Sequence, residues 1–255
     1  MSRTMLFYSK IAALSRNTHK ALHLKPVQTY GFAANSHWLP VAGVEFASVA
    51  RNYVIVFVKE QHGYSPLVVT GLKVGVNQFV DAKGRWKDQV YVPAFVRRYP
   101  FVLADTGLPE PTLTICIDET YEGWGEHQGD ALFAPDGTNT AFLDERVRFM
   151  NGLHAEMKRT QVFTAELEHL GLLVERTLSV PDINGHPFTI GDVFIVDEEQ
   201  LQKHDIRALD KLNRTGTMGW VFAHLHSLGN LSMMMHSHQS PNRSAKNDLV
   251  NEAVH

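Results

Sequence analysis

Cysteine is almost absent from this chain of 255 residues, which contains only Cys116. A single cysteine excludes an internal disulfide and a zinc site built from paired cysteines. Cys116 lies in "LTICID" (113–118), a run typical of a strand, whereas a reactive thiolate needs a helix N-terminus or a cationic neighbour. We therefore expect Cys116 to be a small buried core residue. The scarcity of cysteine also favours a reducing, cytoplasmic location.

Long hydrophobic runs are also missing. The longest, "YVIVFV" at residues 53–58, is far shorter than the roughly 20 apolar residues that a membrane-spanning helix needs. Near the start, Ser9 and Lys10 interrupt the apolar stretch of about 7–15 residues that a signal peptide requires. The sequence therefore predicts a protein that is neither inserted in a membrane nor secreted by the general route.

An excess of positive charge is missing as well, because the formal net charge is -3. No global positive field exists to hold a phosphate backbone, so a dedicated nucleic-acid-binding protein is not expected. The glycine-rich phosphate and dinucleotide loops, the Gly-x-Ser-x-Gly elbow and the His-Glu-x-x-His helix are all absent. The commonest nucleotide-binding and hydrolase functions thus have no support, and the sequence assigns no cofactor.

The composition, with 44% hydrophobic and 20% charged residues, is typical of an ordinary globular protein. The first half is rich in β-branched and aromatic runs separated by turn residues, which predicts a mostly antiparallel sheet. The expected strands lie at 53–60, 65–81, 89–96, 100–105 and 113–118.

The second half predicts about three helices and one β-hairpin, which makes the fold class α+β. A helix is expected from Thr140 or Asn139, as cap, to Gly171, where glycine suits the position after a helix end. A hairpin is expected around Asn184-Gly185, a dipeptide that favours type I′ turns. Further helices are expected over 197–213, capped by Asp197, and over 215–235. We expect one domain over residues 1–235 and a polar, frayed tail over 236–255.

The histidines, 14 in all, are scattered. His224 and His226 form one close pair, and His236 and His238 form another. Residues i and i+2 share a face of a strand but lie about 200° apart on a helix, so a helical pair cannot chelate a metal. We interpret the first pair as helical, with His224 packed inward and His226 directed elsewhere. No metal site is predicted locally, although ligands from distant segments stay open.

A loop rich in glycine and charge, 119–139, follows the last expected strand. Carboxylates of Glu122, Glu126 and Asp130 lie in it beside Tyr121 and Trp124. Sugar- and peptide-binding clefts have this composition, and so do solvated loops. Both interpretations stay open, and Trp124 is taken as a candidate binding residue.

The stretch "YVPAFVRRYPF" (91–101) is the strongest candidate for a binding element. Its two prolines restrict the backbone on either side of Arg97 and Arg98. On a strand the two arginines would face opposite sides, and on a helical turn they would splay by about 100°. An arginine fork beside aromatic rings suits a carboxylate or phosphate, which makes Tyr91, Arg97, Arg98 and Tyr99 candidate ligand-binding residues. The alternative is that one arginine pairs with a buried acid, such as Asp105 or Asp118, and fixes a corner of the fold.

Several blocks of the sequence resemble the SapC family of bacterial proteins, over roughly Leu22 to Leu231. They are "HWLPVAGVEFASVARNYVIVFV", "GLKVGVNQFVDAKGRWKDQVYVPAFVRRYPF", "VDEEQLQK" and "GWVFAHLHSLGNL". The family name comes from surface-layer gene clusters. The resemblance also implies gene neighbourhoods with TonB-dependent receptors, tryptophan-halogenase-like flavoproteins and cupin-like proteins. It implies no catalytic residues, and the peptide-transporter permease of the same name differs, since a permease needs spanning segments.

Three functions follow as hypotheses. The first is an accessory protein that binds a small anionic molecule, peptide or glycan and is linked to peptide or glycan uptake or modification. The second is a metal-dependent oxygenase whose histidine and acid ligands are dispersed. The third is a component of surface-layer assembly, against which the missing secretion signal argues.

Overall fold

The computed structural model describes residues 6–27, 29–105, 113–182 and 184–239. Its largest sheet has five strands in the order β10-β11-β4-β5-β3, and every pair in it is antiparallel. These strands are β3 (Trp38–Pro40), β4 (Val54–Glu60), β5 (Gly63–Val69), β10 (Leu173–Pro181) and β11 (Pro187–Val196). Strands from the first half and from the later hairpin thus form one antiparallel sheet, which agrees with the predicted α+β class.

Two smaller antiparallel sheets are also present in the described part of the chain. One has the order β1-β7-β6, with β1 (Ile11–Ala13), β6 (Phe101–Asp105) and β7 (Leu113–Asp118). The other has the order β8-β2-β9, with β2 (His23–Leu24), β8 (Trp124–Gly125) and β9 (Asp130–Ala131). Cys116 is buried in β7, as predicted, and burial raises the pKa of its thiol.

The strand predictions over 65–81 and 89–96 were wrong in part. The chain leaves the sheet after Val69, because Thr70 and Gly71 both donate their backbone N–H groups to the carbonyl of His37. Residues 89–93 form no strand, and residues 94–97 form the helical turn α2 (Ala94–Arg97). Pro93 lacks the N–H group that a ladder needs and precedes the turn as its N-cap.

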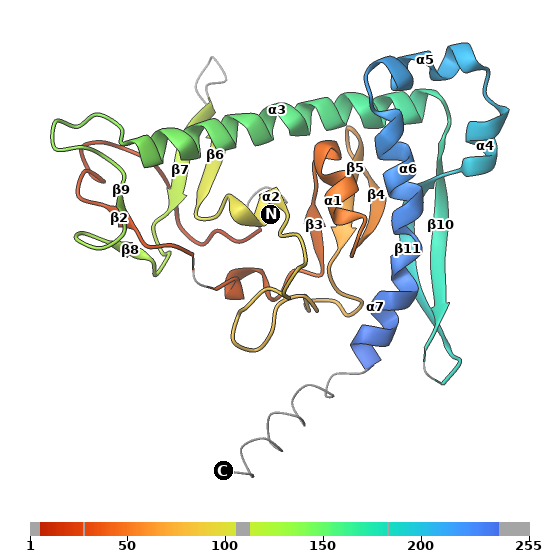
Figure 1. Ribbon diagram of the computed structural model, residues 1–255, viewed down its shortest axis with the longest axis horizontal. Helices are drawn as coiled ribbons and strands as arrows, with labels where there is room; N and C mark the ends of the chain where they lie inside the picture. The colour runs from red at the N-terminus through yellow and green to blue at the C-terminus, as the bar shows by residue number, and fades with distance from the viewer. Residues whose placement is uncertain (1–5, 28, 106–112, 183, 240–255) are drawn as a thin grey trace, which may run out of the picture.

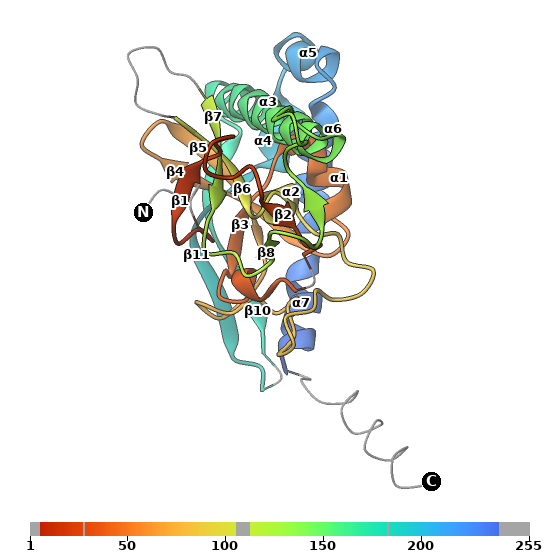
Figure 2. The same cartoon turned by 90° about the vertical axis from the view of Figure 1, so that its left-hand side faces the viewer.

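The helix α3 (Ala141–His169) runs along the whole molecule, above β6 and β7 at one end and beside α6 at the other (Figure 1). Thr140 caps it by accepting a hydrogen bond from the backbone N–H of Leu143, and Gly171 follows its end with a φ of 64°. Both ends were predicted correctly. Its contacts with β5, β6 and β9 bring it against all three sheets. Figure 2 shows the molecule turned by 90°, with α3 seen roughly along its axis.

The hairpin was predicted correctly, but its connection is longer than a two-residue turn. The ladder ends at the pair Pro181 and Pro187, so residues 182–186 connect the strands. The Asp182 carboxylate accepts hydrogen bonds from the backbone N–H groups of Asn184 and His186. This side chain therefore supports the loop that the Asn-Gly dipeptide alone was expected to make.

The last two expected helices are each broken in two. α4 (Glu198–Lys203), capped by Asp197 as predicted, stops at His204, whose ring contacts the carbonyl of Leu170, and Asp205 caps α5 (Ile206–Arg214). α6 (Met218–Ser227) is followed by α7 (Asn230–Gln239), at whose start the buried Asn230 donates to the carbonyls of Ala50 and Tyr53. Helix α7 thus extends four residues past the expected end of the domain, and residues 240–255 lie outside the described part of the chain.

The main hydrophobic core lies between the five-stranded sheet, α1 (Phe46–Val49), α3 and α6. A smaller cluster lies at the other end of α3, around Leu24, Phe101, Leu132 and Leu143. The described residues include two 3₁₀ turns, η2 (Gly31–Ala33) and η3 (Gly43–Glu45). Among the helices described, none combines the length and apolar character that crossing a membrane requires.

Candidate functional site

The candidate arginines lie at the end of the short helical turn α2, and they point in different directions. Arg97 is exposed, whereas the neighbouring Arg98 keeps only 8% of its surface exposed. The turn is helical, so adjacent side chains splay by about 100°. The two arginines therefore enter different surroundings.

The Arg97 side chain is held in place by three neighbours. Its Nε–H donates to the carbonyl of Val92 at 3.0 Å, and Nη2 donates to the hydroxyl of Tyr91 at 2.9 Å. Its guanidinium lies over the rings of Tyr91 and Phe149, with centroids at 5.5 and 5.4 Å. A guanidinium has five N–H groups, and these bonds engage two of them, which leaves donors for an anion.

The buried Glu45 anchors this arrangement from below. One oxygen of its carboxylate accepts from the Tyr91 hydroxyl at 3.0 Å and from the backbone N–H of Ala94 at 2.7 Å. The other accepts from the backbone N–H of Ala42 at 3.3 Å. Burial, followed by the Glu45 charge, raises the pKa of Tyr91, so Tyr91 stays a neutral donor. Glu45 thus positions Tyr91, and Tyr91 positions Arg97.

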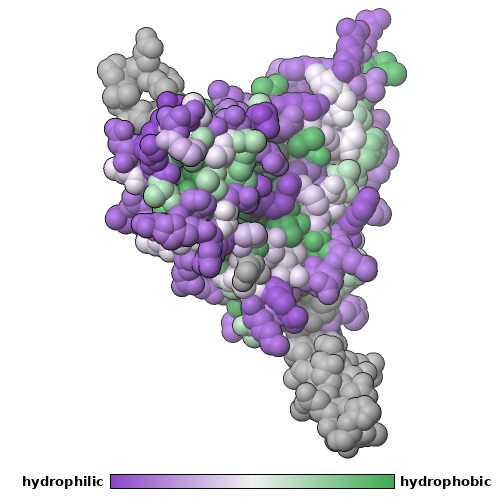
Figure 3. Space-filling model, turned by 60° about the vertical axis from the view of Figure 1, so that its left-hand side comes forward, coloured by the Kyte–Doolittle hydropathy of each residue, from purple (hydrophilic) through white to green (hydrophobic). Residues whose placement is uncertain are grey.

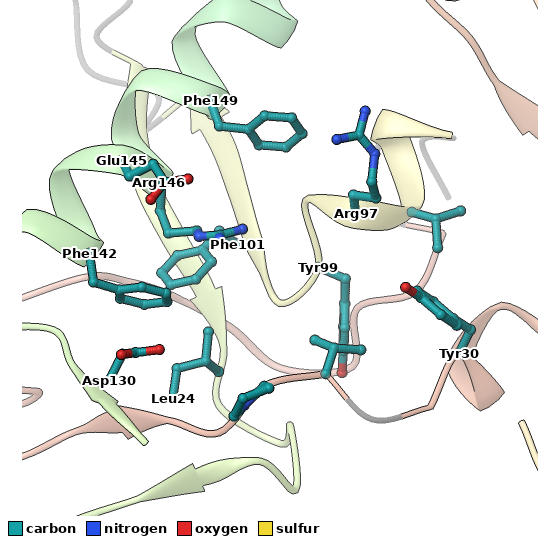
Figure 4. Close-up of a pocket in the computed structure, with 13 residues that line it drawn as sticks. Leu24, Tyr30, Arg97, Tyr99, Phe101, Asp130, Phe142, Glu145, Arg146 and Phe149 are labelled. Carbon is teal, nitrogen blue, oxygen red and sulfur yellow. The ribbon is translucent and has the colours of Figure 1, made fainter. Parts of the chain in front are cut away.

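Arg97 forms part of the wall of a cleft of about 450 Å³ (Figure 4). The opposite wall comes from the first turns of α3, which present Phe142, Glu145, Arg146 and Phe149 at the spacing of one helix face. The other lining residues come from β2, α2, β6, β9 and the segments next to them: Leu24, Pro26, Val27, Tyr30, Val96, Tyr99, Phe101 and Asp130. In Figure 3, which turns this end of the molecule forward, apolar side chains lie between hydrophilic ones on the surface.

Arg146 is the second cation of the cleft, and the sequence did not single it out. Its guanidinium lies over the ring of Phe142, with the centroid at 5.1 Å. Its Nε is buried and has no hydrogen-bond partner among the described residues. Leaving a buried donor unsatisfied costs about 1–3 kcal/mol, which an incoming acceptor would remove.

Tyr99 lines the cleft with its aromatic ring, but its hydroxyl contacts the surrounding fold. Its ring stacks on Phe32 with centroids 4.2 Å apart, and its Oη lies 3.5 Å from Oδ2 of Asp118. Burial and the Asp118 charge raise the pKa of Tyr99, so its hydroxyl stays protonated. Tyr99 offers a ring to a ligand and no general base.

Arg98 lies on the other side of the turn, against the ring of Phe95, with its guanidinium 3.9 Å from the centroid. The expected partner Asp118 instead accepts from the backbone N–H groups of Ser9, Lys10 and Thr120 and from the Thr120 hydroxyl. The side chain of Asp105, the other expected partner, lies outside the described residues. Arg98 does not line the cleft of Arg97; it lines a separate cavity.

Trp124, the remaining predicted site residue, is not among the side chains that line the cleft. Its indole N–H donates to the carbonyl of Asp118 at 2.7 Å, and its ring packs against Phe101 and Tyr121. From the charged loop over 119–139, Asp130 reaches the cleft. Of the predicted site residues, Arg97 and Tyr99 line the cleft, and Tyr91 contacts Arg97 without lining the cleft. Arg98 and Trp124 lie apart from the cleft.

His224 and His226 behave as a helical pair. His224 is fully buried, accepts from the backbone N–H of Val196 at 3.1 Å and contacts the carbonyl of Ile55 at 3.0 Å, while His226 is exposed. Burial lowers the pKa of His224 to about 4. Within the described ranges, no three histidine, cysteine or acidic side chains lie close enough together to hold a metal ion.

The comparisons with known proteins agree with the resemblance in the sequence. The family model of SapC matches residues 14–234, so the chain belongs to the SapC family. Neither the curated proteins nor the solved structures contain a match to this chain.

Proposed function

We propose that this SapC-family protein binds a small organic anion in the cleft between α2 and α3. The observation that carries the proposal is the convergence of Arg97 and Arg146 from two elements on one aromatic-walled cleft. Arginine forks suit carboxylate and phosphate groups, and aromatic faces suit the planar or apolar body attached to them.

The geometry supports an anion more than a cation at this end of the cleft. Arg97 is held in position by Val92 and Tyr91, so little side-chain entropy remains to be lost when an anion binds. The unsatisfied Nε of Arg146 would gain an acceptor. Asp130 and Glu145 also line the cleft, so they would repel a second anionic group elsewhere on the ligand or bind an amino group of the ligand. A ligand with one anionic group fits this distribution of charges.

The proposed biological role is that of an accessory protein in the uptake or modification of peptides or glycans. It rests on the gene neighbourhoods of the family, together with rings that can stack on a sugar or a peptide side chain. We place the protein in the cytoplasm as part of this proposal, because a chain with a single cysteine suits a reducing compartment. Cell fractionation tests the location, and recovery outside the cytoplasm would instead favour a role in surface-layer assembly.

The metal-dependent oxygenase remains the second candidate, and it has no ligand set within the described residues. Metal analysis of protein without a tag decides it. Iron, manganese or zinc near one equivalent, with a metal-dependent rise in melting temperature, would favour the oxygenase over a simple binding protein.

The binding proposal is tested by titrating phenyl phosphate into the full-length protein and measuring the heat of binding, with phenol as the neutral analogue. We expect saturable binding of phenyl phosphate and at least tenfold weaker binding of phenol. Arg146→Met should weaken phenyl phosphate binding about tenfold or more, the loss expected for a charged hydrogen bond of about 1.5–3 kcal/mol.

Arg148→Gln is the matched control, because Arg148 is exposed on the same helix and does not line the cleft. It removes the same charge two residues away and should leave the affinity within about twofold, since exposed charge pairs contribute little. Absence of phenyl phosphate binding, or an equal loss in the two variants, would refute a site at the cleft.

A further inference from the structure

A second cavity, of about 280 Å³, lies on the opposite side of α2 from the cleft. α3 supplies one wall with Met150, Leu153, His154 and Met157, again at the spacing of one helix face. The facing wall comes from α2, β5 and β6, with Arg98 and Phe95 from the α2 segment. Ligand sites for drug-sized molecules measure about 300–1,000 Å³, so this cavity suits a smaller molecule.

His154 is the polar group that the surrounding fold does not account for. Its Nε2 is buried and has no hydrogen-bond partner within the described part of the chain. Most of its neighbours in the cavity are apolar, including Met150, Leu153, Met157 and Leu103. A leucine or methionine here would fill the same space without the cost of about 1–3 kcal/mol for an unsatisfied buried group. An imidazole at this position is explained by a ligand that supplies the missing partner.

Arg98 gives the cavity its charge. Its guanidinium is buried and stacked on Phe95, and burial lowers the pKa of Arg98 from the usual value. A guanidinium carries its positive charge across the ordinary pH range. A positive charge acts over a longer range inside a protein than in water, because the effective dielectric constant is lower. The cavity therefore favours an anionic over a neutral head group.

Glu60 and Ser65 also line the cavity, and Glu60 is exposed. The Ser65 hydroxyl donates to the Glu60 carboxylate at 2.8 Å. An acid here disfavours a second negative charge on the ligand, so a singly charged head group fits better than a phosphate monoester.

We propose that this cavity is a second binding site, for a small monocarboxylate with an apolar chain. The carboxylate lies at Arg98 and His154, and His154 donates from Nε2 to one of its oxygens. The apolar chain packs along Met150, Leu153 and Met157. Because different arginines and different turns of α3 line the cleft and the cavity, either site can fail its test without the other.

Titration of octanoate into the full-length protein, followed by NMR of the methionine methyl groups, tests the site. We expect saturable shifts of the Met150 and Met157 methyl signals, and much weaker shifts with octanol at the same concentration. His154→Leu should weaken octanoate binding about tenfold or more. The same variant should not lower the melting temperature, because His154 Nε2 has no protein partner to lose.

Arg146→Met is the control for location, since Arg146 lines the cleft and not this cavity. It should leave the octanoate affinity within about twofold, as expected for distant sites without shared partners. Three results would each overturn the proposal: no saturable shift of these methyl signals, equal binding of octanol, or unchanged octanoate binding in His154→Leu.

Discussion

The two sides of α2 place adjacent arginines in contrasting environments. Arg97 is exposed, bonded to Val92 and Tyr91, and faces a cleft with a second arginine. Arg98 is buried against Phe95 and faces a mostly apolar cavity with a histidine. One helical turn thus divides a single sequence motif between two cavities, and the chemistry of each arginine is set by the elements opposite it.

Because Arg98 is buried and Arg97 is exposed, we expect the largest effect when variants of these two residues are compared for stability. Arg98→Ala should lower the free energy of unfolding by about 3 kcal/mol, because it removes a large buried side chain packed on Phe95. Arg97→Ala should lower it by less than about 1 kcal/mol, because it removes exposed hydrogen bonds. Urea denaturation of both variants measures the two free energies of unfolding. Similar losses would mean that both arginines serve only to stabilise the turn of the chain at α2.

A change in pH tests the buried core around His224 rather than the two arginines. The pKa of His224 is about 4 in the folded protein, below the unfolded value of about 6.5. The unfolded state therefore binds the proton more readily, and stability is lost as the pH falls from about 6.5 towards 4. By pH 4.5 the loss from this group should reach about 2–3 kcal/mol.

Urea denaturation at several pH values measures this slope. His224→Gln should be less stable at pH 7 and should lose less stability between pH 6.5 and 4.5 than the unmodified protein does. An unchanged slope in the variant would show that other groups cause the acid sensitivity.

The support beneath Arg97 predicts a smaller effect. Glu45→Gln keeps the size of the side chain but has one acceptor oxygen where the carboxylate has two, and the carboxylate accepts three hydrogen bonds. We expect a loss of about 1–2 kcal/mol in stability, together with several-fold weaker phenyl phosphate binding because Tyr91 no longer holds Arg97.

The control for this prediction is Glu126→Gln, an equivalent change at an exposed loop position, which should alter neither stability nor binding. If Glu45→Gln lowered stability and left phenyl phosphate affinity unchanged, the link from Glu45 through Tyr91 to Arg97 would have no part in binding.

Sequence patterns correctly predicted the helix ends and strands that depend on residues close to them in the chain. The cap at Thr140, the glycine at 171 and the hairpin strands are as expected, and His224 packs inward. The breaks after Lys203 and Ser227 were not predicted, because they depend on His204 reaching Leu170 and on Asn230 reaching Ala50 and Tyr53. These partners are distant in the sequence.

The site was only partly predictable for the same reason. Tyr91, Arg97 and Tyr99 lie in one conspicuous motif, but Glu45 lies 46 residues before Tyr91. By helical spacing, Arg146 and His154 lie on the same face of α3 as Met150 and Leu153, but the sequence does not show which elements face them. Only the packing of α3 against α2 and the sheets places them at the two cavities. Trp124 was a reasonable candidate by composition, and its indole N–H is instead taken by the carbonyl of Asp118.

A crossed titration tests the division of the two arginines most directly. Phenyl phosphate and octanoate are each titrated into the unmodified protein, Arg146→Met and His154→Leu. We predict that Arg146→Met loses phenyl phosphate and keeps octanoate, and that His154→Leu does the reverse. If either variant lost both ligands while keeping its melting temperature, or if neither lost its own, the two sides of α2 would not be two separate sites.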